Sequence, residues 1–154
     1  MSQPYAFTYV IGYRHRMDRL SNLKRVLEWI NGFNGVEVLL IEQDRHSKVK
    51  NLNLRAKHIF VKSDMPYNRS WAFNIALKYA QSPILVFGDS DLMMNPNEFI
   101  EGLKALQSHE MVSPYYSVVD LTQPIVIPIN CNTAGGAEAN AVSIDRVLVE
   151  VMNK

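Results

Sequence analysis

Two aspartates separated by one serine, Asp89 and Asp91, follow an apolar run that ends at Phe87 and Gly88. A carboxylate left unpaired beside a buried strand is energetically costly, so the pair requires a partner. A turn after Gly88 can bring both carboxylates to one side, where they suit Mg²⁺ or Mn²⁺, because these cations prefer hard oxygen ligands and take few from protein. The pair therefore predicts a metal-bound diphosphate, although turns and helix caps give the same pattern more often.

Three arginines are candidates for binding the phosphates of such a ligand. Arg14 and Arg16 follow the first predicted strand, and Arg69 begins the second predicted helix. A guanidinium group can bind a phosphate through two parallel hydrogen bonds, and the free N–H groups at a helix N-terminus also favour an anion. A surface ion pair is the alternative role for each arginine.

Two acidic residues after the second predicted strand, Glu42 and Asp44, can accept hydrogen bonds from a nucleobase or a ribose. The four histidines are isolated in the sequence and show no zinc-ligand spacing. Cys131 is the single cysteine, which excludes an internal disulfide and a cysteine-based zinc site.

Charge is distributed unevenly along the chain. Residues 1–80 carry 13 Lys and Arg against 6 Asp and Glu, whereas residues 81–154 carry 3 against 9, although the net charge is only +1. This asymmetry suits a polyanionic ligand held by arginines and by a bridging divalent cation. Residues 46–58 form a basic stretch that raises nucleic acid as a partner. Because this stretch has no interleaved aromatic residues, we expect a solvated loop there and no nucleic-acid binding.

The 154 residues, of which 47% are hydrophobic and 20% charged, indicate one globular domain spanning 1–154. The apolar runs are far shorter than the ~20 residues that cross a bilayer. The first residues also lack the basic-then-apolar order of a signal peptide. We therefore expect no membrane span and a cytoplasmic location.

Strand-like and helix-like segments alternate along the chain. Strands are expected over 5–11, 36–41, 58–61, 84–87, 111–119 and 124–129. Helices are expected over 20–30, over 70–81, after a cap at Asn95 and after Ser143. The alternation predicts an α/β sandwich with a mainly parallel central sheet. In such sheets ligands bind beyond the carboxyl ends of the strands, where residues 13–16, 42–44 and 89–91 are expected.

Taken in order, these segments resemble the nucleotide-binding half of a GT-A fold glycosyltransferase, an α/β/α nucleotide-diphospho-sugar transferase. The similarity is closest to the galactosyltransferase-like and chondroitin-polymerase-like branch of family 2. It rests on VIGYRHRMDRLSNL at 10–23, VLLIEQD at 38–44, PYNRSWAFNIALKYA at 66–80, the D-x-D motif of FGDSDLMM at 87–94, and AGGAEANAVSIDRV at 134–147. The ordered set is more specific than any one of its members.

The resemblance implies a reaction in which a sugar passes from a UDP-linked donor to an acceptor hydroxyl. A bound Mn²⁺ or Mg²⁺ would neutralise the departing diphosphate. The implied contacts are Tyr13, Arg14 and Asp44 near the uridine, Arg69 near the nucleotide, Asp89 and Asp91 at the metal and sugar nucleotide, and Gly135 and Gly136 beside the acceptor.

The sequence departs from the family pattern after the Gly-Gly segment. The family continues with a helix, an acidic segment bearing the expected base and often a metal-binding histidine, whereas this sequence ends at Lys154. Glu138 does not match the base position, so no catalytic base is assigned. The chain is then a compact variant or fragment with a substitute residue, a sugar-nucleotide-binding module with little activity, or a homo-oligomer whose second subunit completes the site.

A nucleotidyltransferase is an alternative from another enzyme class, because such enzymes use a similar α/β sheet and metal-binding carboxylates. The absence of a Gly-rich, Lys-bearing loop near residue 12 argues against it.

Overall fold

The computed structural model describes residues 5–115, 117–120 and 141–143. The chain divides into two compact units, Met1–Ser90 and Asp91–Lys154.

The first unit contains a parallel sheet with the strand order β3-β2-β1-β4. Its strands are β1 (Phe7–Tyr13), β2 (Val36–Asp44), β3 (Lys57–Lys62) and β4 (Leu85–Gly88). All three pairings between neighbours are parallel, which confirms the parallel sheet expected from the sequence. The carboxyl ends of the four strands therefore lie at one edge, called the carboxyl edge below.

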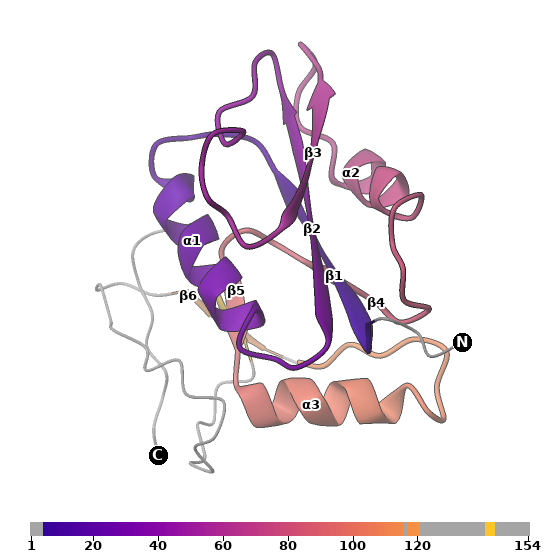
Figure 1. Cartoon of the computed structure of the whole chain (residues 1–154). Coiled ribbons are helices and arrows are strands. Elements are labelled where there is room, and N and C mark those ends of the chain that lie inside the picture. The colour runs from indigo at the N-terminus through magenta and orange to yellow at the C-terminus, as the bar shows by residue number, and fades with distance from the viewer. Residues whose placement is uncertain (1–4, 116, 121–140, 144–154) are drawn as a thin grey trace. The chain divides into compact units, whose positions relative to one another are not determined.

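Two helices, α1 (Arg19–Ile30) and α2 (Arg69–Ala76), cover opposite faces of this sheet, as Figure 1 shows. In β1, Tyr9 meets Trp29 of α1 edge to face, with ring centroids 6.0 Å apart. Its neighbour Val10 instead belongs to the buried cluster that includes Ala76 of α2. Successive strand side chains point to opposite faces, so this alternation gives the layers helix, sheet, helix.

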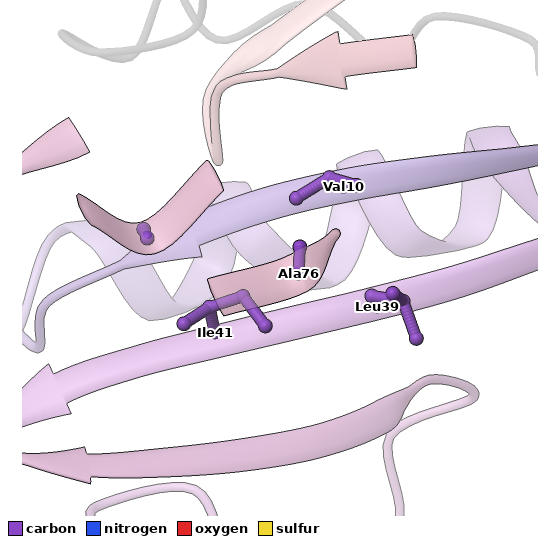
Figure 2. Packing of buried hydrophobic residues seen from close by; sticks show 5 residues of the cluster. Val10, Leu39, Ile41 and Ala76 are labelled. Carbon is purple, nitrogen blue, oxygen red and sulfur yellow. The ribbon is translucent and has the colours of Figure 1, made fainter. Parts of the chain in front are cut away.

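The α2 face of the sheet is closely packed. Figure 2 shows Val10, Leu39 and Ile41 of the sheet beside Ala76 of α2. The three larger side chains are fully buried, and each such burial stabilises the fold by about 1.5–3 kcal/mol. The small alanine side chains of α2 allow the helix backbone to approach the strands closely.

Helix α2 ends at Ala76, before the expected residue 81. The N–H of Gln81 donates to Glu37 Oε2 at 2.8 Å, and the N–H of Ser82 donates to Thr8 Oγ1 at 3.3 Å. The Thr8 hydroxyl also donates to Glu37, at 2.7 Å. These polar side chains of the sheet hold the segment after the helix, whereas α2 itself gives way to tighter turns, in which the N–H groups of Lys78 and Tyr79 donate three residues back, to Ile75 and Ala76.

The second unit contains β5 (Leu92–Met94), α3 (Pro96–Ala105), β6 (Val118–Asp120) and β7 (Ala141–Ser143). Strand β7 lies between the other two, antiparallel to β5 and parallel to β6. Helix α3 begins as predicted, because Asn95 accepts the N–H of Asn97 at 2.9 Å and Pro96 takes the first helical position.

The sequence pattern is less informative in this unit. Of the strand expected over 111–119, only the end is strand among the residues that the structure describes, as part of β6. Pro114 lacks an N–H, and a Cβ on Gly102 of α3 would lie 2.8 Å from the Pro114 Cβ, so Pro114 packs against the helix. Strands β5 and β7 are too short for their alternation to be recognised. Ser143, expected as a helix cap, pairs with Leu92 at the end of β7.

The strand predicted over 124–129 and the helix predicted after Ser143 lie outside the described residues. Within the described part of the chain, no helix is both long and apolar enough to cross a membrane.

Candidate functional site

At the carboxyl edge, Gln43 of β2 fixes the start of α2. Its side-chain Nε2 donates to the Asn68 carbonyl at 2.8 Å, and its Oε1 accepts the Asn68 N–H at 3.0 Å. Gln43 is fully buried. Asn68 in turn caps α2, because its Oδ1 accepts the N–H of Trp71 at 2.9 Å. The first turn of α2, which carries Arg69, is therefore held on the sheet by directional hydrogen bonds.

Arg69 and Asp89, both predicted site residues, form an ion pair at this edge. Arg69 Nη2 lies 3.1 Å from Asp89 Oδ2, and the two side chains are 53% and 38% exposed. The Arg69 guanidinium also lies over the ring of Phe73, 5.4 Å from its centroid. Phe73 stacks on Phe87 of β4, with ring centroids 4.6 Å apart. The pair thus joins the start of α2 to the residue that follows β4.

Arg14 follows β1, and its Nη1 donates to the main-chain carbonyl of Met65 in the segment between β3 and α2. The neighbouring Gly12 is covered by that segment, because a Cβ on Gly12 would lie 2.0 Å from the Tyr67 hydroxyl and 3.2 Å from the Ala72 Cβ. The chain before α2 therefore passes directly over the end of β1, and Arg14 is tied to it.

Tyr13 and Glu42 form a separate group, since the register of β1 and β2 pairs them directly. Tyr13 is buried, and its hydroxyl lies 3.1 Å from His15 Nδ1. Burial, and then the nearby Glu42 carboxylate, raise the pKa of Tyr13 to about 12. Tyr13 is therefore a neutral phenol at physiological pH.

Glu42 is fully buried and accepts hydrogen bonds from the loop that follows β2. The Ser47 hydroxyl donates at 2.6 Å and the Lys48 N–H at 2.7 Å. His58 Nε2 of β3 lies 2.9 Å from the same carboxylate. Glu42 thus anchors the 45–50 loop to the sheet. Its contact with a nucleotide, expected from the sequence, stays a prediction.

Asp44 and Arg16 have local partners. Asp44 Oδ1 accepts the N–H of Arg45 at 2.7 Å, and the Asp44 carbonyl accepts the N–H of Ser63 at 3.0 Å. Arg16 forms an exposed ion pair with Asp18 at 2.9 Å, which is the alternative role that the sequence left open. Exposed pairs of this kind contribute little to stability.

The remaining predicted site residues lie beyond the first unit. Asp91 is the first residue of the second unit, and Gly135 and Gly136 lie outside the described residues. The described part of the chain contains no group of three or more His, Cys, Asp or Glu side chains that could hold a metal ion. The Asp89 carboxylate, a partly exposed hard oxygen donor, nevertheless fits Mg²⁺ or Mn²⁺, since these ions fill most positions with water and phosphate oxygens.

Two residues that organise this edge were not singled out in the sequence. Gln43 lies between Glu42 and Asp44, and the two-residue period of a strand places it on the opposite face, toward α2. Phe73 follows Arg69 by four positions, the spacing at which helical side chains are neighbours. Both patterns are visible in the sequence once the strand and the helix are assigned.

The basic stretch is exposed, as expected of a solvated loop. Lys48, Lys50 and Arg55 are exposed, and Lys57 Nζ lies 5.3 Å from the centroid of the Tyr79 ring. Arg45, just before the stretch, pairs with Asp64 at 3.0 Å.

The carboxyl edge thus holds a fixed arginine, an adjacent carboxylate, a second tethered arginine and a buried neutral phenol, all within the first unit. No protein-family model matches the chain, and no curated protein matches it.

Proposed function

We propose that the chain is a metal-dependent glycosyltransferase that binds a UDP-linked sugar at the carboxyl edge and transfers the sugar to an acceptor hydroxyl. The observation that supports this proposal is the 3.1 Å contact between Arg69 and Asp89. It places a planar, fork-shaped cation and a hard oxygen ligand side by side, at the edge where open parallel sheets bind ligands.

Different parts of the ligand bind to different groups at this edge. Arg69 binds the diphosphate by charge-assisted hydrogen bonds, supported by the N-terminus of α2. Arg14, tethered to Met65, adds a second cation beside the same segment. Asp89, with Asp91, holds Mn²⁺ or Mg²⁺, which when bound neutralises charge on the leaving diphosphate.

The uridine end of the ligand lies, in this proposal, near Tyr13 and Asp44 at the ends of β1 and β2. With its pKa raised to about 12, the Tyr13 phenol keeps its proton and remains a hydrogen-bond donor. The connection from β1 to α1 contains neither glycine nor lysine, which favours this reading over a nucleotidyltransferase.

Calorimetric titration of UDP, with and without Mn²⁺, tests the proposal. We expect Mn²⁺ to tighten UDP binding by roughly tenfold, a typical coupling between two ligands at one site. Asp89→Ala should remove this Mn²⁺-dependent gain. Glu28→Gln, which alters an exposed carboxylate on α1, is the matched control and should bind UDP as the wild type does.

A second measurement separates transfer from binding. The wild type is incubated with a series of UDP-sugars and Mn²⁺, and the release of UDP is followed with and without sugar acceptors. UDP release above background supports the enzyme. UDP binding that is absent or indifferent to Mn²⁺ overturns the donor-site assignment, whereas tight binding without UDP release would indicate a binding module.

A further inference from the structure

We propose that Asp89 masks Arg69 when no ligand is bound. The inference rests on the proposed function, which gives Asp89 to the metal and Arg69 to the diphosphate. In the structure the two groups pair with each other, at 3.1 Å. A diphosphate that binds both arms of the guanidinium fork must therefore displace Asp89 from Nη2, and a metal ion that takes Asp89 frees this arm of Arg69 for the diphosphate.

The ion pair between Arg69 and Asp89 can readily open, so that each side chain exchanges the other for a ligand. The structure gives one contact, from Nη2 to Oδ2, and the side chains are 53% and 38% exposed. Exposed ion pairs are weak, because water and salt compete for both charges. A ligand that offers either group a better partner can open the pair at little cost.

Phe73 keeps Arg69 in place when the pair opens. The guanidinium lies 5.4 Å from the Phe73 centroid, and this contact does not involve Asp89. Phe73 is itself braced by Phe87 of β4, at 4.6 Å. The main chain before Arg69 is held by Gln43, through both hydrogen bonds to Asn68. Arg69 can thus change its partner while its own position is kept.

Masking makes the two ligands cooperative. Without metal, the Asp89 carboxylate competes with the diphosphate for Arg69. Because both are anions, the carboxylate also repels the diphosphate. With metal, the same carboxylate becomes a ligand and its negative charge is compensated. Coupling of this kind is reciprocal, so the diphosphate must strengthen metal binding by the same factor.

The test is UDP binding to the intact chain carrying Asp89→Asn, measured in EDTA and in Mn²⁺. In EDTA we expect UDP to bind about threefold to tenfold more tightly than to the wild type, because a weak ion pair and a repulsive charge are removed. In Mn²⁺ we expect weaker binding than to the wild type, because the metal loses a ligand. A change of opposite sign in the two conditions is not expected from damage to the fold.

The EDTA gain must depend on Arg69. Arg69→Gln should weaken UDP binding, and Asp89→Asn placed in the Arg69→Gln background should give a clearly smaller gain, because only the repulsive charge is then removed; a double-mutant cycle measures the difference. Far-UV circular dichroism checks the folding of each variant. Asp89→Ser provides a second unmasked variant if the asparagine variant is poorly folded.

Asp64→Asn is the control for net charge. Asp64 is an exposed carboxylate of the same unit, paired with Arg45 at 3.0 Å, so its removal deletes one charge and one ion pair but does not free Arg69. An equal EDTA gain in Asp64→Asn would overturn the masking.

The remaining outcomes separate the two proposals. If the wild type binds UDP more tightly with Mn²⁺ while Asp89→Asn shows no EDTA gain, the masking is overturned and the proposed function stands. If the wild type binds no UDP in either condition, both are overturned.

Discussion

Glu42 and Gln43 are adjacent polar residues, both fully buried, that organise opposite faces of the sheet. Glu42 collects donors from the 45–50 loop and His58, whereas Gln43 binds the backbone before α2. The sequence predicts polar residues at the end of β2 and, by strand alternation, their opposite directions. It could not show that the loop folds back onto Glu42, because that depends on where Ser47 and Lys48 place their donors.

Glu42→Gln should destabilise the protein. In the glutamine, an NH₂ group takes the place of one carboxylate oxygen. Both oxygens accept hydrogen bonds in the wild type, so this NH₂ group would face a donor in a fully buried position. We expect the free energy of unfolding to fall by about 2–3 kcal/mol, measured by urea denaturation. Glu28→Gln, at an exposed position of α1, should stay within about 0.5 kcal/mol of the wild type. Equal stabilities of the two variants would contradict the anchoring role of Glu42.

Tyr13 should make stability depend on alkaline pH. The folded pKa is about 12 and the ordinary value is 10.0. Above pH 10 the unfolded chain loses this proton while the folded chain keeps it, so the unfolded state gains stability as pH rises. The contribution of Tyr13 is therefore full below pH 10 and is lost as pH rises toward 12, by on the order of 1 kcal/mol per pH unit.

Urea unfolding at several pH values above pH 9 measures this effect. The wild type should lose stability more steeply than Tyr13→Phe, which has no proton to lose at this position. Parallel slopes for the two proteins would show that another group is responsible.

At the scale of elements, two glycines allow close approaches at the strand ends. A Cβ on Gly12 would lie 2.0 Å from the Tyr67 hydroxyl, whereas a Cβ on Gly88 would lie 2.0, 2.3 and 2.8 Å from three atoms of the Tyr9 side chain. The first obstacle is the far end of one side chain. The second is a ring buried between β1 and α1, which has little room to move.

Gly12→Ala should therefore cost about 1–3 kcal/mol of stability, and Gly88→Ala should cost more. Tyr67→Phe removes the hydroxyl that the new methyl group meets, so it should recover part of the loss in Gly12→Ala and none in Gly88→Ala. Thermal denaturation of the single and double variants checks both expectations. Recovery in both backgrounds, or in neither, would be inconsistent with these contacts.

Long elements with a regular apolar spacing could be predicted from the sequence. Short elements, and features that depend on contacts between residues distant in sequence, could not. The four strands of the first unit and the helices α1 and α3 follow from apolar spacing and from the Asn95-Pro96 start. The segment that follows α2 is held by Glu37 and Thr8, which are distant in sequence and accept the N–H groups of Gln81 and Ser82. The pairing of β5 with β7 likewise joins short segments that carry little periodic signal.

At the scale of the molecule, the first unit holds the whole parallel sheet, both of its helices and most of the candidate site. Tyr13, Arg14, Arg69 and Asp89 all belong to it. A polypeptide of residues 1–90 should therefore fold by itself, with one cooperative urea transition. Its β1 and β2 amides should exchange most slowly with solvent, because these strands are paired on both sides. Non-cooperative unfolding would show that residues after 90 are needed for this core.

The joint between β2 and α2 has a consequence for motion. Gln43 binds both the N–H and the C=O of one residue, Asn68, as a residue of an antiparallel strand would, so α2 is attached to the sheet at two points. One bond would act as a pivot, whereas two bonds also restrain rotation of the helix about its axis. The direction in which Arg69 leaves the helix is then set by the sheet. Gln43→Glu retains the acceptor for the Asn68 N–H but loses the donor to the Asn68 carbonyl. Helix α2 should then rotate more freely about its axis, and the Arg69 guanidinium should occupy a wider range of orientations.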